Sequence, residues 1–421
     1  MRRLDAGPAA PPLLEDVHFK SLYRKEIYGA PTRDGWLLQI SRYRPVPQPW
    51  HQPILNEPLL LVPGWSQNRH AFTAGKFVQQ LLHDGADVHI AELRGHGLSS
   101  RALQQARASR EGRALPVDFD WGWDLDSYLL EDIPAAVAAV RARTGRSKVY
   151  YVGNSMGGML GYGYAAQHDD LAGLVTIGAP SDIGRGFFLL RAGAFLGPAI
   201  LSPTIDALLY AASSAAAMRQ RTASTLRKLR VLRRLADRLA APSAEPLDFR
   251  FRHVPVDFAL RQLSRAITPG NLRRFGRLDG IARRAGSVVN PARVTVDDIR
   301  WLLREGGEKE PRRVIQQFAR WIRNDEMVCY RTGFDYKAHF GNIRVPLAII
   351  FGDLDKIASH ASTRSIYKRA RSEYLLWRGV KDNSHLELTM GYDVRQVCAD
   401  IRDLVEHTMG RPSHGRGDAR G

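Results

Sequence analysis

The sequence of this 421-residue chain predicts an α/β fold, with a mostly parallel, doubly wound sheet and a large helical insertion. Short apolar runs alternate with helical segments from residue 58 to about 180, which is typical of a parallel sheet covered by helices on both faces. The alternation stops over residues 181–342, where helical, arginine-rich stretches show no clear strand. It resumes at residues 346–352, so we expect one sheet with strands from both sides of the insertion.

The composition is that of a globular protein, with 44% hydrophobic and 25% charged residues. Two cysteines, Cys329 and Cys398, are too few for a disulfide framework and suit a reducing compartment. No secretory peptide and no run of 18 apolar residues is found, so we expect a soluble, cytoplasmic protein. The formal net charge of +18 suits an anionic membrane, a nucleic acid or an acidic substrate, or simply an arginine-rich solvated surface.

The individual elements follow from local pattern. Residues 1–16 are rich in proline and alanine and are expected to be disordered, as is the polar tail 410–421. An Asp34–Gly35 turn before alternating apolar residues predicts an N-terminal hairpin. Strands are expected at 58–62, 87–93, 149–152, 174–177, 346–352 and 373–377, and helices at 76–84, 127–143, 156–168 and 393–408. Residues 103–116 are expected to form a polar, arginine-rich loop.

A serine turn at residues 148–157 carries the strongest chemical signal. The run K-V-Y-Y-V-G-N-S-M-G reads as a buried strand, a sharp turn and the start of a helix, with Ser155 at the apex. Gly153 and Gly157 avoid a clash in the crowded turn, and the Met156 N–H points to the same spot as the serine hydroxyl. A nucleophile needs both an exposed hydroxyl and a nearby N–H donor.

The partners that a serine nucleophile needs are found after the insertion. A hydroxyl reacts poorly until a base takes its proton, and that base needs an orienting acid. Strand 346–352 runs into Asp353 and Asp355, and the strand at 373–377 is followed by a loop that carries His385. The carboxyl ends of parallel strands lie at one edge of the sheet, so these groups are expected to meet Ser155 there.

Six motifs in order give the chain a family resemblance. They are T-R-D-G-W (32–36), V-P-G-W (62–65), R-G-H-G-L-S (94–99), G-N-S-M-G-G (153–158), G-D-L-D (352–355) and S-H-L-E-L (384–388). With them the chain resembles the α/β-hydrolase family, and within it the acid-lipase-like esterases and lipases, over most of residues 30–180 and 343–408.

The resemblance implies a role for each matched residue. Ser155 would be the nucleophile, His385 the general base and Asp355 its orienting acid, with Asp353 as the alternative acid. The backbone N–H groups of Trp65 and Met156 would form the oxyanion hole, although this chain has Pro63 where many relatives have histidine. His96 would belong to a structural turn, and we expect Glu92 and Arg94 to form a structural ion pair.

The resemblance also implies a division into domains. It places a catalytic domain at 17–180 and 343–409 and a helical, basic cap at 181–342. An apolar stretch at 187–196 would line an acyl pocket, touch lipid or form the core of the cap.

Residues 181–340 hold 29 Lys/Arg against 15 Asp/Glu, a net of +14. Within them, 219–239 reads as a basic amphipathic helix, which would either pack its leucines on the cap or lie on an anionic membrane.

We therefore expect a serine esterase or lipase that acts on acyl esters or lipids. The same triad would also serve an acyltransferase similar to polyester synthases, which usually have cysteine where Ser155 stands. A third reading is a non-catalytic protein whose basic cap binds membrane or nucleic acid. No metal-ligand spacing and no phosphate loop are found, so we expect no cofactor and no nucleic-acid partner, and the oligomeric state is not predicted.

Overall fold

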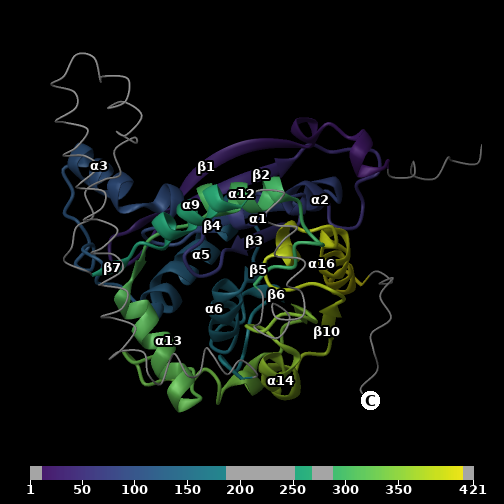
Figure 1. Ribbon diagram of the computed structural model, residues 1–421. Helices are drawn as coiled ribbons and strands as arrows, with labels where there is room; N and C mark the ends of the chain where they lie inside the picture. The colour runs from purple at the N-terminus through teal and green to yellow at the C-terminus, as the bar shows by residue number, and fades with distance from the viewer. Residues whose placement is uncertain (1–11, 186–251, 268–287, 411–421) are drawn as a thin grey trace, which may run out of the picture.

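A computed structural model of the protein describes residues 12–185, 252–267 and 288–410 (Figure 1). Eight strands form one sheet in the order β1-β2-β4-β3-β5-β6-β9-β10. The β1/β2 and β2/β4 pairs are antiparallel and all the other pairs are parallel. The strands are β1 (Tyr23–Pro31), β2 (Leu37–Pro45), β3 (Pro58–Val62), β4 (Asp87–Glu92), β5 (Val149–Asn154), β6 (Leu171–Ile177), β9 (Leu347–Gly352) and β10 (Leu375–Val380).

Helices cover both faces of this sheet. α5, α6 and α14 contribute to one apolar cluster, whereas α2 and α16 contribute to the cluster on the opposite face. The helices are α1 (His70–Thr73), α2 (Phe77–His83), α3 (Arg101–Glu111), α4 (Leu125–Ser127), α5 (Ile133–Thr144), α6 (Met156–Ala165), α14 (His360–Arg369), α15 (Glu387–Met390) and α16 (Val394–Thr408). Short turns are η1 (Leu14–Asp16), η2 (Phe19–Leu22), η3 (Gly97–Ser99), the π-helical η4 (Tyr128–Asp132) and η6 (Phe340–Asn342).

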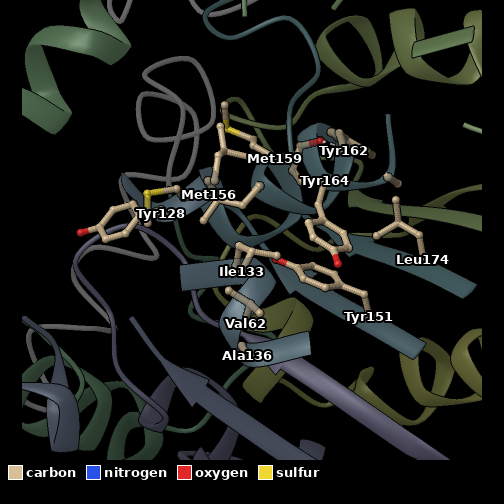
Figure 2. Close-up of a cluster of buried hydrophobic side chains, with 14 of the residues drawn as sticks. Val62, Tyr128, Ile133, Ala136, Tyr151, Met156, Met159, Tyr162, Tyr164 and Leu174 are labelled. Carbon is tan, nitrogen blue, oxygen red and sulfur yellow. Dashed lines mark hydrogen bonds between the residues drawn. The ribbon is translucent and has the colours of Figure 1, made fainter. Parts of the chain in front are cut away.

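The central strands are apolar at consecutive positions because both of their faces are buried. In β3, Leu60 and Val62 face the cluster of α5 and α6, whereas Leu59 and Leu61 face that of α2 and α16. Figure 2 shows part of the first cluster, with Met156 and Met159 of α6 on the same side of the strands as Ile133 of α5. The predicted mostly parallel, doubly wound α/β sheet is thus confirmed.

One predicted element is wrong. The segment expected to be a loop at 103–116 begins within a helix, α3, which runs from Arg101 to Glu111. Only Gln104 and Ala108 of this helix are buried, so it lacks the apolar stripe by which a helix is recognised in a sequence. Gly112, in the left-handed conformation with φ of 62°, ends the helix.

The predicted cap region lies only partly within the described residues. Its described part holds α9 (Val256–Ala266), α12 (Val296–Glu305) and α13 (Arg312–Asn324), and α9 lies beside α12 (Figure 1). It also holds a two-stranded antiparallel pair that was not predicted, β7 (His253–Val254) with β8 (Glu310–Pro311). The apolar stretch 187–196 and the basic segment 219–239 lie outside the described residues.

Three further predictions concern the N-terminal segment, the cysteines and membranes. Residues 12–16 of the segment expected to be disordered lie within the described part, where η1 buries Leu14. Cys329 and Cys398 are both buried free thiols. Across residues 12–185, 252–267 and 288–410, the helices are too short or too polar to cross a bilayer.

Candidate active site

Ser155 lies at the sharp turn between β5 and α6. Its backbone has φ of 51° and ψ of −119°, a conformation that a non-glycine residue adopts only at a cost of about 1–3 kcal/mol. The turn is held on both sides, because the Ser155 N–H donates to the Ile177 carbonyl and the Ser155 carbonyl accepts from the N–H groups of Gly158 and Met159. The side chain of Ser155 is half-buried, at the end of the central strands.

The two glycines that flank the serine are required by close packing. A Cβ on Gly157 would lie 2.2 Å from the Val62 carbonyl oxygen, and one on Gly153 would lie 2.5 Å from the backbone of Gly157. Backbone atoms cannot move aside as a flexible side chain can, so α6 approaches β3 and β5 this closely only with glycine at both positions.

The structure brings His385 and Asp355 to this serine. His385 Nδ1 lies 2.7 Å from Asp355 Oδ2, and His385 Nε2 lies 3.0 Å from Ser155 Oγ. An ionised carboxylate only accepts, so Nδ1 carries the proton in the neutral ring. Nε2 is then free to accept the serine proton, which is the arrangement a general base needs.

The structure distinguishes the two candidate acids. Asp355 is buried, and its Oδ1 accepts from the N–H groups of Ile357 and Ala358, so the carboxylate is fixed toward the histidine. Asp353 is exposed and is not hydrogen-bonded to His385. Gly352 lets the two chain segments meet, because a Cβ there would lie 2.3 Å from the carbonyl oxygens of both Asn383 and Ser384.

Burial and charge act in opposite directions on the pKa of His385. Burial alone would lower it, but the charge of Asp355 and its hydrogen bond outweigh burial, with a smaller contribution from Glu387, and the pKa of His385 is raised above 6.5. The charged imidazolium form of His385 is thus favoured next to Asp355.

The loop after β3 passes directly beside the serine. A Cβ on Gly64 would lie 3.0 Å from Ser155 Cβ, so the Gly64–Trp65 peptide adjoins the Ser155 side chain. The Gly64 N–H donates to Gln67 Oε1 over 3.1 Å, and among the residues that the structure describes the Trp65 N–H has no acceptor. Met156 is the first residue of α6, and the first N–H groups of a helix have no partner within it.

The expected Glu92–Arg94 ion pair is wrong. Glu92 pairs with Arg69 over 3.1 Å. The Arg94 guanidinium, with a side chain that is fully buried, instead contacts three carboxylates from distant parts of the chain. They are those of Asp34, Asp118 and Asp132. Burial alone would lower the pKa of Arg94, but Asp132 and Asp34 outweigh burial and raise it.

Some residues around the site carry no signal in the sequence. Glu310 lies behind the loop that carries Trp65, and the Val288 carbonyl accepts from the His385 N–H over 3.2 Å. Both come from the segment predicted to be a cap, so only the folded chain places them here. No group of three or more His, Cys, Asp or Glu side chains suited to a metal ion occurs within the described part of the chain.

Comparison with known proteins identifies the family. A family model described as the alpha/beta hydrolase fold matches residues 57–386, well over half of the chain. Human lipase member M is 28% identical over 149 residues, which is 33% of this chain and 32% of that protein. A tear acid lipase-like protein from Mesocricetus auratus is 26% identical over 159 residues, covering 36% of this chain and 37% of that protein. The chain thus matches about a third of the length of these relatives.

Solved structures with a similar course of the chain include two hydrolases of low sequence identity. A thermophilic esterase from Thermogutta terrifontis is 14% identical, with 91% of this chain and 99% of that chain covered and a TM-score of 0.47. A monoacylglycerol lipase from Paleococcus ferrophilus is 11% identical, with 88% and 99% covered and a TM-score of 0.47. On the family match and the sheet described above, this chain belongs to the α/β-hydrolase fold family.

Proposed function

We propose that this protein is a serine hydrolase that cleaves carboxylic esters through an acyl-enzyme, with Ser155, His385 and Asp355 as its catalytic triad. The observation that carries the proposal is the continuous hydrogen-bond chain from Ser155 Oγ through His385 to Asp355. All three side chains lie at the carboxyl ends of sheet strands, and Ser155 has the backbone conformation of a nucleophile turn.

The proposed reaction has two halves. His385 Nε2 takes the hydroxyl proton while Ser155 Oγ attacks the ester carbonyl, and the N–H groups of Trp65 and Met156 stabilise the resulting oxyanion. The intermediate collapses, the protonated His385 gives its proton to the departing alcohol, and an acyl-Ser155 ester remains. A water molecule then gives a proton to His385 and attacks that ester, so the carboxylic acid leaves and Ser155 regains its proton.

We propose a lipid-like acyl ester as the substrate class. The family membership supports hydrolysis, and the two relatives named above are called a lipase and a lipase-like protein, although the match covers about a third of their length. The region between β6 and β9, which we propose to be a cap, would select the acyl chain.

Active-site labelling and a substrate panel test the proposed function together. A fluorophosphonate probe should label the wild type and the Ser21→Ala control, in which an exposed serine far from the site is lost, but not Ser155→Ala. Against p-nitrophenyl esters of rising acyl length, Ser155→Ala should lose kcat by at least roughly 10³-fold. Equal labelling or equal turnover in the two variants would refute the mechanism, and no labelling of the wild type would favour a binding protein.

The acceptor of the acyl group is tested by product analysis. An acyltransferase would use the same acyl-Ser155 ester and differ only in passing the acyl group to an alcohol instead of water. With an added alcohol, a hydrolase should release mainly free acid, whereas a transferase should form mainly the new ester. Mass spectrometry of the two products distinguishes these outcomes.

We also propose that the basic region between β6 and β9 brings the enzyme to anionic lipid. The support is its charge, a net of +14 over residues 181–340. Co-sedimentation with vesicles that contain phosphatidylserine should show binding at low salt that weakens as salt is added. Equal binding to neutral vesicles, or none at low salt, would refute this attraction.

A further inference from the structure

The loop that carries Trp65 is hydrogen-bonded to the segment from Glu308 to Glu310, which lies more than 240 positions later in the chain. The Ser66 N–H donates to Glu310 Oε1 over 2.8 Å, and the Glu308 N–H donates to the Ser66 carbonyl over 2.9 Å. The Ser66 hydroxyl also donates to the Glu308 carbonyl. Every polar group of Ser66 is therefore bonded to the chain between Glu308 and Glu310.

These hydrogen bonds hold Ser66 in an unfavourable backbone conformation. Ser66 has φ of 56°, in the left-handed region that a serine adopts only where its surroundings force it. In the absence of the bonds to Glu308 and Glu310, we expect the loop to relax toward an ordinary φ, which would rotate the neighbouring Trp65 peptide.

Glu310 is itself fixed by buried partners. Its side chain is fully buried, the Tyr128 hydroxyl donates to Oε2 over 3.2 Å, and His96 Nε2 lies 3.3 Å from Oε1. Burial alone would lower the pKa of His96, but the charges of Glu310 and Glu308 outweigh burial and raise it. A buried carboxylate that accepts from a hydroxyl and a backbone N–H, with His96 beside it, has little freedom to rotate.

Glu308 joins the same loop to the R-G-H-G turn. Its Oε1 accepts from the Gly97 N–H over 3.0 Å and from the Asn68 side-chain amide over 2.6 Å. Gly97 has φ of 47°, and a Cβ there would lie 2.0 Å from Glu92 Oε1. Through Glu308, the turn at 94–97 is thus hydrogen-bonded to the segment that holds Ser66.

We propose that Glu310 is a positioning residue for the oxyanion hole, and that its carboxylate aims the Trp65 N–H by holding Ser66. The inference rests on the proposed function, in which Trp65 supplies an oxyanion donor. Gln67 anchors Gly64 on the near side of Trp65 and Glu310 anchors Ser66 on the far side, so the donor lies between two fixed residues. An oxyanion donor is effective only when it is already aimed at the place where charge develops.

Two conservative variants of Glu310 distinguish the position of its acceptor oxygen from the charge of its carboxylate. Glu310→Gln keeps an acceptor at the position of Oε1 but loses the charge, whereas Glu310→Asp keeps the charge but draws the acceptor back by one methylene. If Glu310 acts by aiming the loop, kcat should fall roughly 10- to 10³-fold in Glu310→Asp and less than about 10-fold in Glu310→Gln. KM should change less than about threefold in both, because the donor acts on the transition state. Glu305→Gln, with an exposed side chain on the same segment, is the matched control.

The Ki of a trifluoromethyl ketone reports on the oxyanion hole itself. A residue that only stabilised the fold would leave this Ki unchanged in the folded variant. Such a ketone forms a tetrahedral adduct with a serine, and the negative oxygen of that adduct occupies the oxyanion hole. Its Ki should rise in Glu310→Asp by the same factor as kcat/KM falls, while the thermal midpoint of Glu310→Asp confirms a folded protein.

The outcomes decide the inference separately from the proposed function. A wild-type kcat and Ki in folded Glu310→Asp, or an equal loss in Glu310→Gln, would overturn the positioning role. Failure of the wild type to hydrolyse esters or to bind the trifluoromethyl ketone would instead overturn the proposed function, before any variant is compared.

Discussion

His385 Nε2 lies 3.0 Å from Ser155 Oγ, although 230 positions and the whole segment between β6 and β9 separate the two residues in the chain. The other ring nitrogen is held by Asp355, so the imidazole is fixed between an acid and a hydroxyl. In the proposed mechanism, the protonation state of this one ring controls whether Ser155 can react.

The first prediction concerns the pH dependence of activity. Only neutral His385 can take the serine proton, so kcat/KM should fall as the pH falls through the pKa of the ring. Because Asp355 raises that pKa, the acid-side midpoint of the kcat/KM profile should lie above 6.5. The measurement is a pH series with an activated ester, and a midpoint well below 6.5 would contradict the strong coupling to Asp355.

The second prediction tests that coupling with Asp355→Asn. The amide can donate to Nδ1, which favours the wrong tautomer, so kcat should fall roughly 10⁴-fold. The charge that raises the pKa of His385 is also lost, burial then prevails, and the residual activity should have its acid-side midpoint shifted to lower pH. Asp353→Asn, at the exposed alternative position, serves as the control and should keep wild-type kcat. Similar losses in both variants would show that Asp355 is not the sole orienting acid.

Local signals in the sequence were strong enough to predict the sheet and the residues that meet at Ser155. Strands such as β3 and β5 are apolar at consecutive positions, and each motif lies at a strand end, where topology brings it to one edge. The sequence does not reveal α3, because only Gln104 and Ala108 of this helix are buried and Leu103 is exposed. A helix without an apolar stripe has no periodic signal.

Pairings between distant polar residues had no local signal. The partners of Arg94 come from positions 34, 118 and 132, whereas the sequence favoured its close neighbour Glu92. Glu310 likewise looks like one acid among many in a basic region until the fold brings it against Ser66. Such contacts depend on which buried charges remain uncompensated, and that is decided by the whole tertiary structure.

The third prediction concerns close packing at the serine turn. In Gly157→Ala the new methyl group would lie 2.2 Å from the Val62 carbonyl oxygen, so α6 must move away from β3. We expect the free energy of unfolding to fall by about 3 kcal/mol or more, with a loss of kcat as Ser155 shifts. Gly341→Ala is the matched control, because a Cβ there meets nothing nearer than 3.8 Å. Urea unfolding measures both, and equal midpoints would refute the packing argument.

The fourth prediction concerns the buried cluster around Arg94. In Arg94→Met the fully buried Asp132 loses its cation, and the free energy of unfolding should fall by about 3–5 kcal/mol. Adding Asp132→Asn to Arg94→Met should restore part of this loss, because the only fully buried carboxylate of the three partners is then removed. Arg33→Met removes an arginine whose side chain is 79% exposed and should stay close to the wild type.

The pH dependence of the same variant gives an independent check. Burial raises the pKa of Asp132 even with Arg94 present, and removal of the arginine should raise it further. A carboxyl group with a raised pKa in the folded state favours folding in its protonated form, and that contribution is lost as the pH rises through the folded-state pKa. Arg94→Met should therefore be more destabilised, relative to the wild type, at pH 7.5 than at pH 5. Urea midpoints at the two pH values test this, and a penalty that does not change with pH would show that Asp132 is not the group left uncompensated.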